Sequence, residues 1–133
     1  MRPPLDASVL VVEDDKHVRD GVVEGLQEAG YSVAGVGDGQ QALDYLREAA
    51  ILPRLILLDL MMPVMDGVEF RKRQLGSPDF SGIPVVLFTA DTTGREKAAS
   101  MAVKGFLQKP VRLNTLLEVV ERVCGPGDDP LAK

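Results

Sequence analysis

The sequence is short of cysteine, histidine and long apolar runs, and it carries no excess of positive charge. Its one cysteine, Cys124, excludes an internal disulfide bond and is typical of a reducing compartment. No apolar run approaches the length that spans a membrane, and the N-terminal residues lack the apolar centre of a signal peptide. The net charge of −5 argues against a nucleic-acid-binding surface. We therefore expect a cytoplasmic protein with no membrane span and no direct nucleic acid binding.

The single histidine has no partner for a metal site, because no second histidine and only one cysteine accompany it. We interpret His17 as a solvent-exposed residue of the first helix. Cys124 is interpreted as a packing residue rather than a reactive one. Neither residue is expected to carry the chemistry of the protein.

What the sequence does contain is a regular alternation of apolar runs and amphipathic segments. Its 133 residues, 45% of them hydrophobic, indicate one domain with a single core. Apolar runs predict strands, and helical spacing of apolar residues predicts helices. The expected strands are 8–12, 31–36, 55–58, 85–88 and 106–107, and the expected helices are 18–29, 42–50, 68–75, 95–102 and 113–123.

Strand and helix thus alternate five times, which is typical of the α/β class. The expected fold is a single five-stranded parallel sheet, doubly wound, with helices on both faces. The periodicity does not fix the order of the strands. We expect one domain over residues 8–124, between an N-terminal tail, 1–7, and a flexible C-terminal tail, 125–133.

Chemically distinctive side chains follow four of the predicted strands. Glu13 and Asp14 follow the first strand, Asp59 the third, Thr89 the fourth and Lys109 the fifth. A parallel α/β sheet gathers the carboxyl ends of its strands along one edge. We therefore expect three acids, a hydroxyl and a lysine to converge on one site.

The acids admit more than one interpretation. Glu13, Asp14 and Asp15 on their own fit the N-terminus of a helix as well as they fit a metal site. Asp59 ends the most apolar strand, where an isolated carboxylate is costly. Two or three carboxylates suit Mg²⁺, which offsets their mutual repulsion, and a carboxylate can also form an acyl phosphate. A divalent cation and a phosphoryl group together account for the set.

Taken in order, these residues resemble the receiver domain of response regulators, the phosphoacceptor half of two-component signalling. The resemblance covers about residues 8–124 and includes the stretch Leu58-Asp59-Leu60-Met61-Met62-Pro63-Val64-Met65-Asp66-Gly67. It implies a flavodoxin-like strand order of 2-1-3-4-5. It also implies that Asp59 is the phosphorylated residue, and that Asp14, Glu13, Asp59 and the backbone carbonyl of Met61 bind Mg²⁺.

The resemblance further implies a switch rather than an enzyme. A histidine kinase or histidine phosphotransfer protein would donate a phosphoryl group to Asp59, assisted by Thr89 and Lys109. Thr89 and Phe106 would then rearrange, and the surface of the fourth helix, fifth strand and fifth helix would change for an unknown downstream protein target.

Met61 and Asp91, two residues after Asp59 and Thr89, are expected to tune the lifetime of the aspartyl phosphate by flanking the path of water. We predict that crowding by Met61 dominates. The alternative is that Met61 turns outward as exposed surface and Asp91 controls the lifetime.

The sequence also departs from the family pattern. The stretch from Thr89 to Lys109 is shorter than in most receivers, and Ala102 stands where a helix-ending glycine is common. Arg112 precedes the last helix, where a positive charge is mildly unfavourable. Because the stretch from Thr89 to Lys109 is short and Ala102 replaces the helix-ending glycine, the fourth helix is expected to be short or displaced.

Three other functions compete with the switch. A degenerate receiver that never takes phosphate is kept open by the short fourth helix. A phosphohydrolase with an aspartyl-phosphate intermediate needs a general acid two residues after its nucleophile, and here that residue is Met61. A flavin or nucleotide carrier would want a Gly/Ser/Thr-rich loop after the first strand, where this chain has acids.

Overall fold

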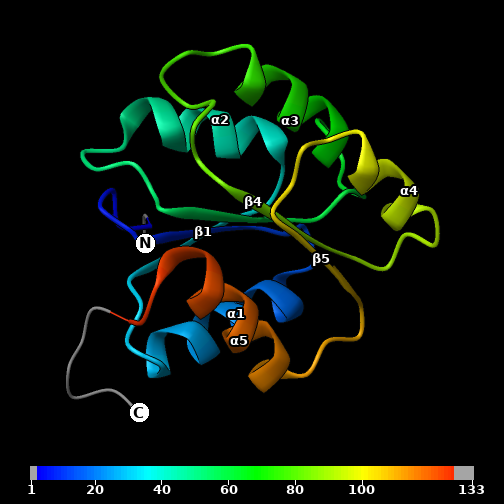
Figure 1. The fold of residues 1–133 in the computed structure, drawn as a ribbon. Coiled ribbons are helices and arrows are strands. Elements are labelled where there is room, and N and C mark those ends of the chain that lie inside the picture. The colour runs from blue at the N-terminus through cyan, green and yellow to red at the C-terminus, as the bar shows by residue number, and fades with distance from the viewer. Residues whose placement is uncertain (1–2, 128–133) are drawn as a thin grey trace.

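The computed structural model describes residues 3–127 and shows a five-stranded, all-parallel sheet of order β2-β1-β3-β4-β5 (Figure 1). The strands are β1 Val9–Val12, β2 Val33–Val36, β3 Leu55–Leu58, β4 Val85–Thr89 and β5 Gly105–Gln108. Both the predicted class and the strand order implied by the family resemblance are confirmed.

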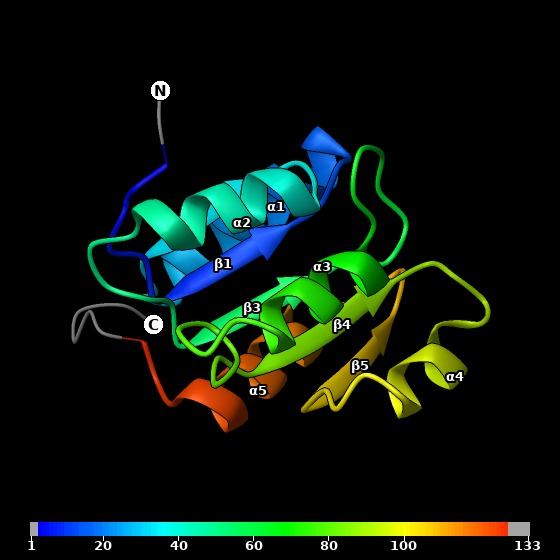
Figure 2. The same cartoon turned by 90° about the horizontal axis from the view of Figure 1, so that it is seen from above.

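Helices cover both faces of the sheet, as Figures 1 and 2 show. Helices α1 (Lys16–Glu28) and α5 (Leu113–Cys124) lie on one face, and α2 (Gly39–Glu48), α3 (Gly67–Leu75) and α4 (Gly94–Ala99) lie on the other. Alternate residues of each strand enter the two cores, because side chains of a strand point to opposite faces in turn. Leu10 and Val12 pack beneath α2 and α3, whereas Val9 and Val11 pack beneath α1 and α5. This double burial explains why the central strands β1 and β3 are continuous apolar runs.

The first helix begins earlier than its apolar spacing predicts, at Lys16. The Asp15 carboxylate caps it by accepting the N–H groups of His17 and Val18 at 2.9 and 3.2 Å. The helix-start interpretation of the acidic run is therefore correct for its third member, Asp15. His17 is exposed on α1, as predicted.

The second strand begins at Val33, two residues later than predicted. The backbone turns at Gly30, whose φ is +97°, so Tyr31 precedes the strand rather than opening it. The Tyr31 hydroxyl donates to the carbonyl of Gly125 at 2.7 Å and so joins the segment before β2 to the end of α5.

The fourth helix is short, as predicted, and it ends at Ala99 rather than near residue 102. Ala102 has a φ of +53°, a left-handed conformation that glycine adopts most readily. Arg112 occupies the N-cap position of α5 and makes no side-chain capping bond. Ala102 thus lies in the turn after α4, and Arg112 lies at the start of α5.

The expected tails fall partly outside the described residues, which leaves 1–2 and 128–133 without a description. Of the described part, the carbonyl of Leu5 accepts the N–H of Ala50 at 2.8 Å, and Ala7 is fully buried. The boundaries at residues 8 and 124 stay a prediction.

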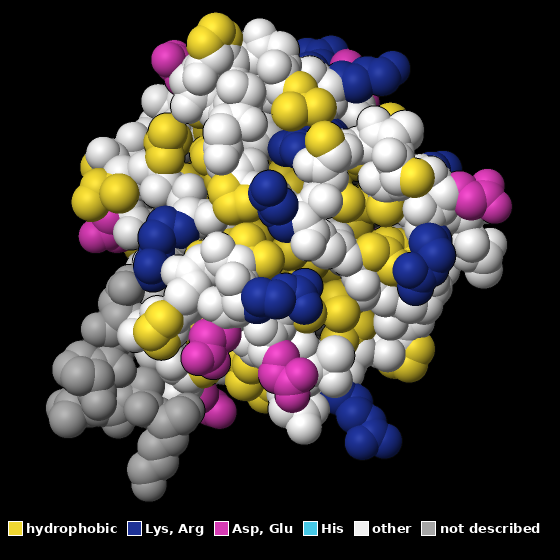
Figure 3. Space-filling view, viewed as in Figure 1, with side chains coloured by type: hydrophobic (Ala, Val, Ile, Leu, Met, Phe, Trp, Pro, Cys, Tyr) yellow, Lys and Arg dark blue, Asp and Glu magenta, His cyan; other side chains and the backbone are white. Residues whose placement is uncertain are grey.

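Within residues 3–127 no helix has both the length and the apolar character needed to cross a membrane. On the face shown in Figure 3, Lys and Arg side chains are spread among hydrophobic and uncharged atoms rather than gathered in one patch.

Candidate functional site

Three acids from two neighbouring strands form a cluster at the carboxyl edge of the sheet. Carboxylate oxygens of Glu13, Asp14 and Asp59 lie within 4.8 Å of one another, and we call these residues the acid cluster. Glu13 and Asp59 are only 1% and 4% exposed, whereas Asp14 is exposed. The structure therefore brings together the three acids that the sequence placed at strand ends.

The register of the central strands explains why these acids meet. Val12 of β1 pairs with Leu58 of β3, so the residues that follow them emerge side by side. The Asp59 N–H donates to the carbonyl of Val12 at 3.0 Å and fixes the end of β3 against the end of β1. Parallel pairing thus sets the geometry of the site before any side chain is considered.

The connection from β3 to α3 passes very close to Asp59. A Cβ atom on Gly67 would lie 2.3 Å from the carbonyl oxygen of Asp59 and 2.9 Å from the Cα of Leu60. Any side chain at this position would therefore force the backbone of Asp59 and Leu60 to shift. Asp66 caps α3 by accepting the N–H of Glu69 at 2.9 Å, which fixes the direction in which the chain leaves the site.

Lys109 reaches back from the end of β5 into the acid cluster. Its ammonium donates to the Glu13 carboxylate and, at 3.2 Å, to Asp59 Oδ2. It also lies 4.7 Å from the centre of the Phe88 ring, and the Lys109–Pro110 peptide bond is cis. The lysine that the sequence placed at the last strand end thus contacts both buried acids.

Burial and charge act in opposite directions on these groups. Burial raises the pKa of the Glu13 carboxyl, although the hydrogen bond from Lys109 opposes the shift. Burial alone would lower the pKa of Lys109, but the hydrogen bond to Glu13 and the charges of Asp59 and Glu13 outweigh it and raise that pKa. Lys109 is therefore positively charged at neutral pH and offsets part of the negative charge of the acid cluster.

The acid cluster has the donor chemistry of a magnesium site. At an effective dielectric constant near 20, two carboxylates about 4 Å apart repel each other by about 4 kcal/mol. One ammonium leaves three ionised carboxylates with a net negative charge, and hard carboxylate oxygens are the ligands that Mg²⁺ prefers. The Met61 N–H donates to Asp59 Oδ1 at 3.3 Å, so this backbone also faces the site. The use of the Met61 carbonyl as a ligand stays a prediction.

Thr89 and Phe106 meet beside the first residue of α4. Thr89 is fully buried, and Phe106 is half-buried with the guanidinium of Arg95 4.9 Å from the centre of its ring. A Cβ atom on Gly94 would lie 2.8 Å from Thr89 Cγ2 and 2.9 Å from Phe106 Cε1. The close approach of these three residues depends on the missing side chain of Gly94, which the sequence analysis did not single out.

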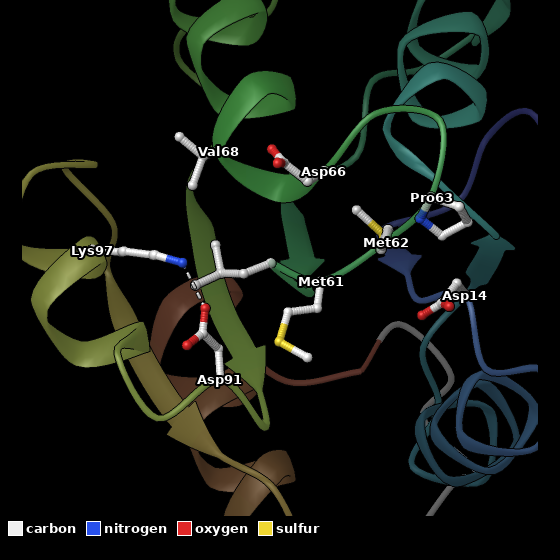
Figure 4. Close-up of a pocket in the computed structure, with 9 residues that line it drawn as sticks. Asp14, Met61, Met62, Pro63, Asp66, Val68, Asp91 and Lys97 are labelled. Carbon is white, nitrogen blue, oxygen red and sulfur yellow. Dashed lines mark hydrogen bonds and ion pairs between the residues drawn. The ribbon is translucent and has the colours of Figure 1, made fainter.

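A cavity of about 340 Å³ opens beside the acid cluster (Figure 4). Its wall includes Asp14, Met61, Asp91 and Lys97. The Met61 side chain is 57% exposed to solvent, and it also forms part of the cavity wall. The Lys97 ammonium bonds the Asp91 carboxylate at 2.7 Å. Sequence analysis missed Lys97, because its position depends on where the short helix α4 begins.

Comparison with known proteins identifies the family. Residues 9–121 match the family model described as the response regulator receiver domain. The response regulator MprA of Mycobacterium tuberculosis (strain H37Rv) is 35% identical over 115 residues, which cover 85% of this chain and 48% of MprA. The chain thus spans about half the length of that curated relative.

Solved structures agree with this result. The chemotaxis protein CheY4 of Vibrio cholerae superimposes with a TM-score of 0.79 and 33% identity, covering 89% of this chain and 98% of CheY4. The signal receiver domain of a histidine kinase from Syntrophus aciditrophicus gives a TM-score of 0.80 and 28% identity, with 96% and 99% coverage. The family match, the relatives, the strand order and the acid cluster all agree. The chain belongs to the response regulator receiver domain family of two-component signalling.

Proposed function

We propose that this chain is a phosphorylation-dependent signalling switch in which Asp59 accepts a phosphoryl group from a histidine kinase or histidine phosphotransfer protein. Receiver domains pair with histidine kinases. The observation that carries the proposal is the placement of Asp59. It is a buried carboxylate at the end of a central strand, clustered with two other acids and contacted by Lys109.

Magnesium fits the donor set of the acid cluster. Asp14, Glu13 and Asp59, with the backbone carbonyl of Met61, would hold the ion. The ion would neutralise the acid cluster and the incoming phosphoryl oxygens.

The transfer itself asks little of the protein beyond positioning and charge. A carboxylate oxygen of Asp59 forms a bond to phosphorus while the nitrogen–phosphorus bond of the phosphohistidine breaks, and the bonding electrons leave with the imidazole. Lys109 acts as a point-charge partner for the transferred oxygens. The Thr89 hydroxyl then donates a hydrogen bond to the new phosphoryl group.

The signal follows from the added charge. A phosphoryl group brings about −1.5 to −2 charges and strong acceptor oxygens, and these draw Thr89 toward Asp59. Thr89 packs against Gly94, which also packs against Phe106, so a shift of Thr89 changes the space open to the Phe106 ring. The surface of α4, β5 and α5 changes as a result and is read by a protein target.

Mass spectrometry after incubation with Mg²⁺ and acetyl phosphate tests the proposal. The wild type is expected to gain one phosphoryl group, and Asp59→Asn none, because an amide is not nucleophilic. Asp66→Asn is the matched control, since Asp66 is another acid, lines the cavity beside the acid cluster, and caps α3 as asparagine also can. A wild type without an adduct is a degenerate receiver. An adduct on Asp59→Asn places the acceptor at another residue.

A further inference from the structure

Asp91 links the buried Thr89 hydroxyl to helix α4. The Thr89 hydroxyl oxygen accepts the backbone N–H of Asp91 at 3.2 Å. The Asp91 carboxylate accepts the N–H and the hydroxyl of Thr93 at 2.9 and 2.8 Å, and the ammonium of Lys97 at 2.7 Å. Figure 4 shows the side chains of Asp91 and Lys97 pointing toward each other at one side of the cavity. One residue thus bonds the candidate switch hydroxyl through its backbone and α4 through its side chain.

Helix α4 depends on this residue because it is too short to be stable alone. It has six residues, and Thr93 at its N-cap makes no side-chain capping bond. The first N–H groups of a helix lack partners within the helix. Here the carbonyl of Asp91 accepts the N–H of Gly94 at 3.0 Å, and the carboxylate accepts that of Thr93. Asp91 therefore fastens the first turn of α4.

The segment just after α4 is fixed to another helix, α3. Arg71 on α3 is 5% exposed and donates to the carbonyls of Met101 and Ala102 at 2.9 and 2.8 Å. Its guanidinium also donates to the buried Gln74 at 2.7 Å, so three hydrogen bonds orient the planar group. The segment after α4 is thus held to α3, while the start of α4 is held to the candidate site.

We propose that Asp91 couples Thr89 to α4, and that Lys97 and Thr93 are positioning residues that hold its carboxylate. The inference rests on the proposed function, because it takes Thr89 to move toward a phosphoryl group on Asp59. As the hydroxyl turns to that group, the Asp91 N–H loses its acceptor and the Asp91 backbone shifts. The carboxylate carries Thr93 and Lys97 with it, so the first turn of α4 pivots about the following segment, which Arg71 holds.

The same contacts define the part that Asp91 takes in hydrolysis of the aspartyl phosphate. The hydrogen bonds from Lys97 and Thr93 lower the pKa of Asp91 to about 2. A carboxylate with so low a pKa is a poor base for water near neutral pH. Its oxygens are also occupied by the groups that begin α4. These contacts suit Asp91 to fasten α4 rather than to act as a base, and the decay of Asp91→Ala phosphoprotein tests whether it also controls the lifetime.

The first experiment needs no phosphate. Amide hydrogen exchange of α4 residues 95–99 is measured in the unmodified wild type, Lys97→Met, Asp91→Asn and the double variant. Each single variant is expected to exchange faster by roughly two- to fivefold, the range for a partly exposed ion pair. The double variant is expected to match the singles, because both remove the same contact.

Two further variants separate positioning from a general loss of stability. Lys97→Arg restores a cation that can bond Asp91, and it is expected to return the exchange of α4 toward the wild-type rate. Lys72→Met removes an exposed lysine from α3 and is expected to leave α4 unchanged. Effects of Lys97→Met and Asp91→Asn that add fully in the double variant would show that the two residues act independently, which overturns the proposal.

The second experiment adds Mg²⁺ and acetyl phosphate. Exchange in α4 is compared at the same adduct fraction, measured by mass. The wild type is expected to change its α4 exchange on phosphorylation, and Lys97→Met is expected to lose at least about half of that change. No adduct on the wild type would overturn the proposed function and the coupling with it. An adduct with an equal α4 response in Lys97→Met would overturn the coupling alone.

Discussion

Lys109 contacts both buried acids of the site, so its removal leaves their repulsion without an offset. Lys109→Met keeps an apolar stem beside Phe88 but removes the ammonium. Breaking a buried ion pair on one side costs about 3–5 kcal/mol, and the 17% exposure of Lys109 places it at the low end. Urea denaturation without Mg²⁺ is therefore expected to show a loss of about 3 kcal/mol in the free energy of unfolding. Lys72→Met is the exposed control, and equal stability of both variants would contradict the expectation.

Met61 tests how the site controls water. Its side chain lines the cavity beside the acid cluster and offers no hydrogen bond to orient a water molecule. Met61→Asn is expected to speed the decay of purified phosphoprotein by up to about a hundredfold, because an amide can position the attacking water. Asp91→Ala serves as the comparison. No change in Met61→Asn, together with slower decay in Asp91→Ala, would assign control of the lifetime to Asp91.

Single residues also show where sequence reasoning succeeds and where it ends. Glu13, Asp59 and Lys109 could be placed together in advance, because parallel strands bring their carboxyl ends to one edge. Lys97 and Gly94 could not, since their neighbours depend on where α4 starts and how it lies on the sheet. Apolar spacing does not determine either property in a helix of six residues.

At the scale of elements, the connection from β3 to α3 is set by backbone contact rather than by side chains. Gly67→Ala would bring a methyl group within 2.3 Å of the Asp59 carbonyl oxygen, and backbone atoms there cannot move aside. We expect a loss of about 3 kcal/mol in the free energy of unfolding, at the upper end of ordinary overpacking. Urea denaturation followed by circular dichroism measures it.

Gly21 in α1 is the matched control for Gly67. A Cβ atom there has no neighbour within 4 Å, and the residue is an exposed position inside a helix. Gly21→Ala is therefore expected to raise the free energy of unfolding by about 0.5–1 kcal/mol, because alanine loses less backbone entropy on folding. Two substitutions of the same kind thus change stability in opposite directions. A mild effect at both positions would show that the loop after Asp59 can relax.

Element ends illustrate what the sequence leaves undetermined. The bounds of β3 were predicted correctly, because an uninterrupted apolar run of four residues has no other place in this fold. The start of α1 was missed, since Asp15 both ends the acidic run and caps the helix. The exact first residue of a helix follows from which N–H groups the capping side chain accepts, and the structure is needed to show those hydrogen bonds.

At the scale of the whole molecule, the site is arranged for function at the expense of stability. The acid cluster places two buried carboxyl groups and one exposed carboxylate together at the edge of an otherwise apolar sheet. Such a cluster lowers the stability of the metal-free fold, because the carboxylates repel one another more in the folded state than in the extended chain. The folded state should therefore be stabilised by any ion that binds the cluster.

Magnesium is expected to raise the stability of the wild type through this linkage. At 100 times its dissociation constant, an ion that binds only the folded state adds about 2.7 kcal/mol to the free energy of unfolding. That gain corresponds to a rise of roughly 10 °C in melting temperature for a domain of this size. Calorimetry with Mg²⁺ and with a chelator measures the difference.

Asp14→Ala separates metal binding from general stabilisation. It is expected to change the metal-free melting temperature and the Mg²⁺-dependent rise in opposite directions. Removing the exposed member of the acid cluster relieves repulsion, so the metal-free variant is expected to melt at or slightly above the wild-type temperature. The same change removes a metal ligand, so the Mg²⁺-dependent rise is expected to disappear. Asp44→Ala, an exposed acid on α2 away from the acid cluster, keeps the full rise. An unchanged rise in Asp14→Ala would show that magnesium stabilises the protein at some other site.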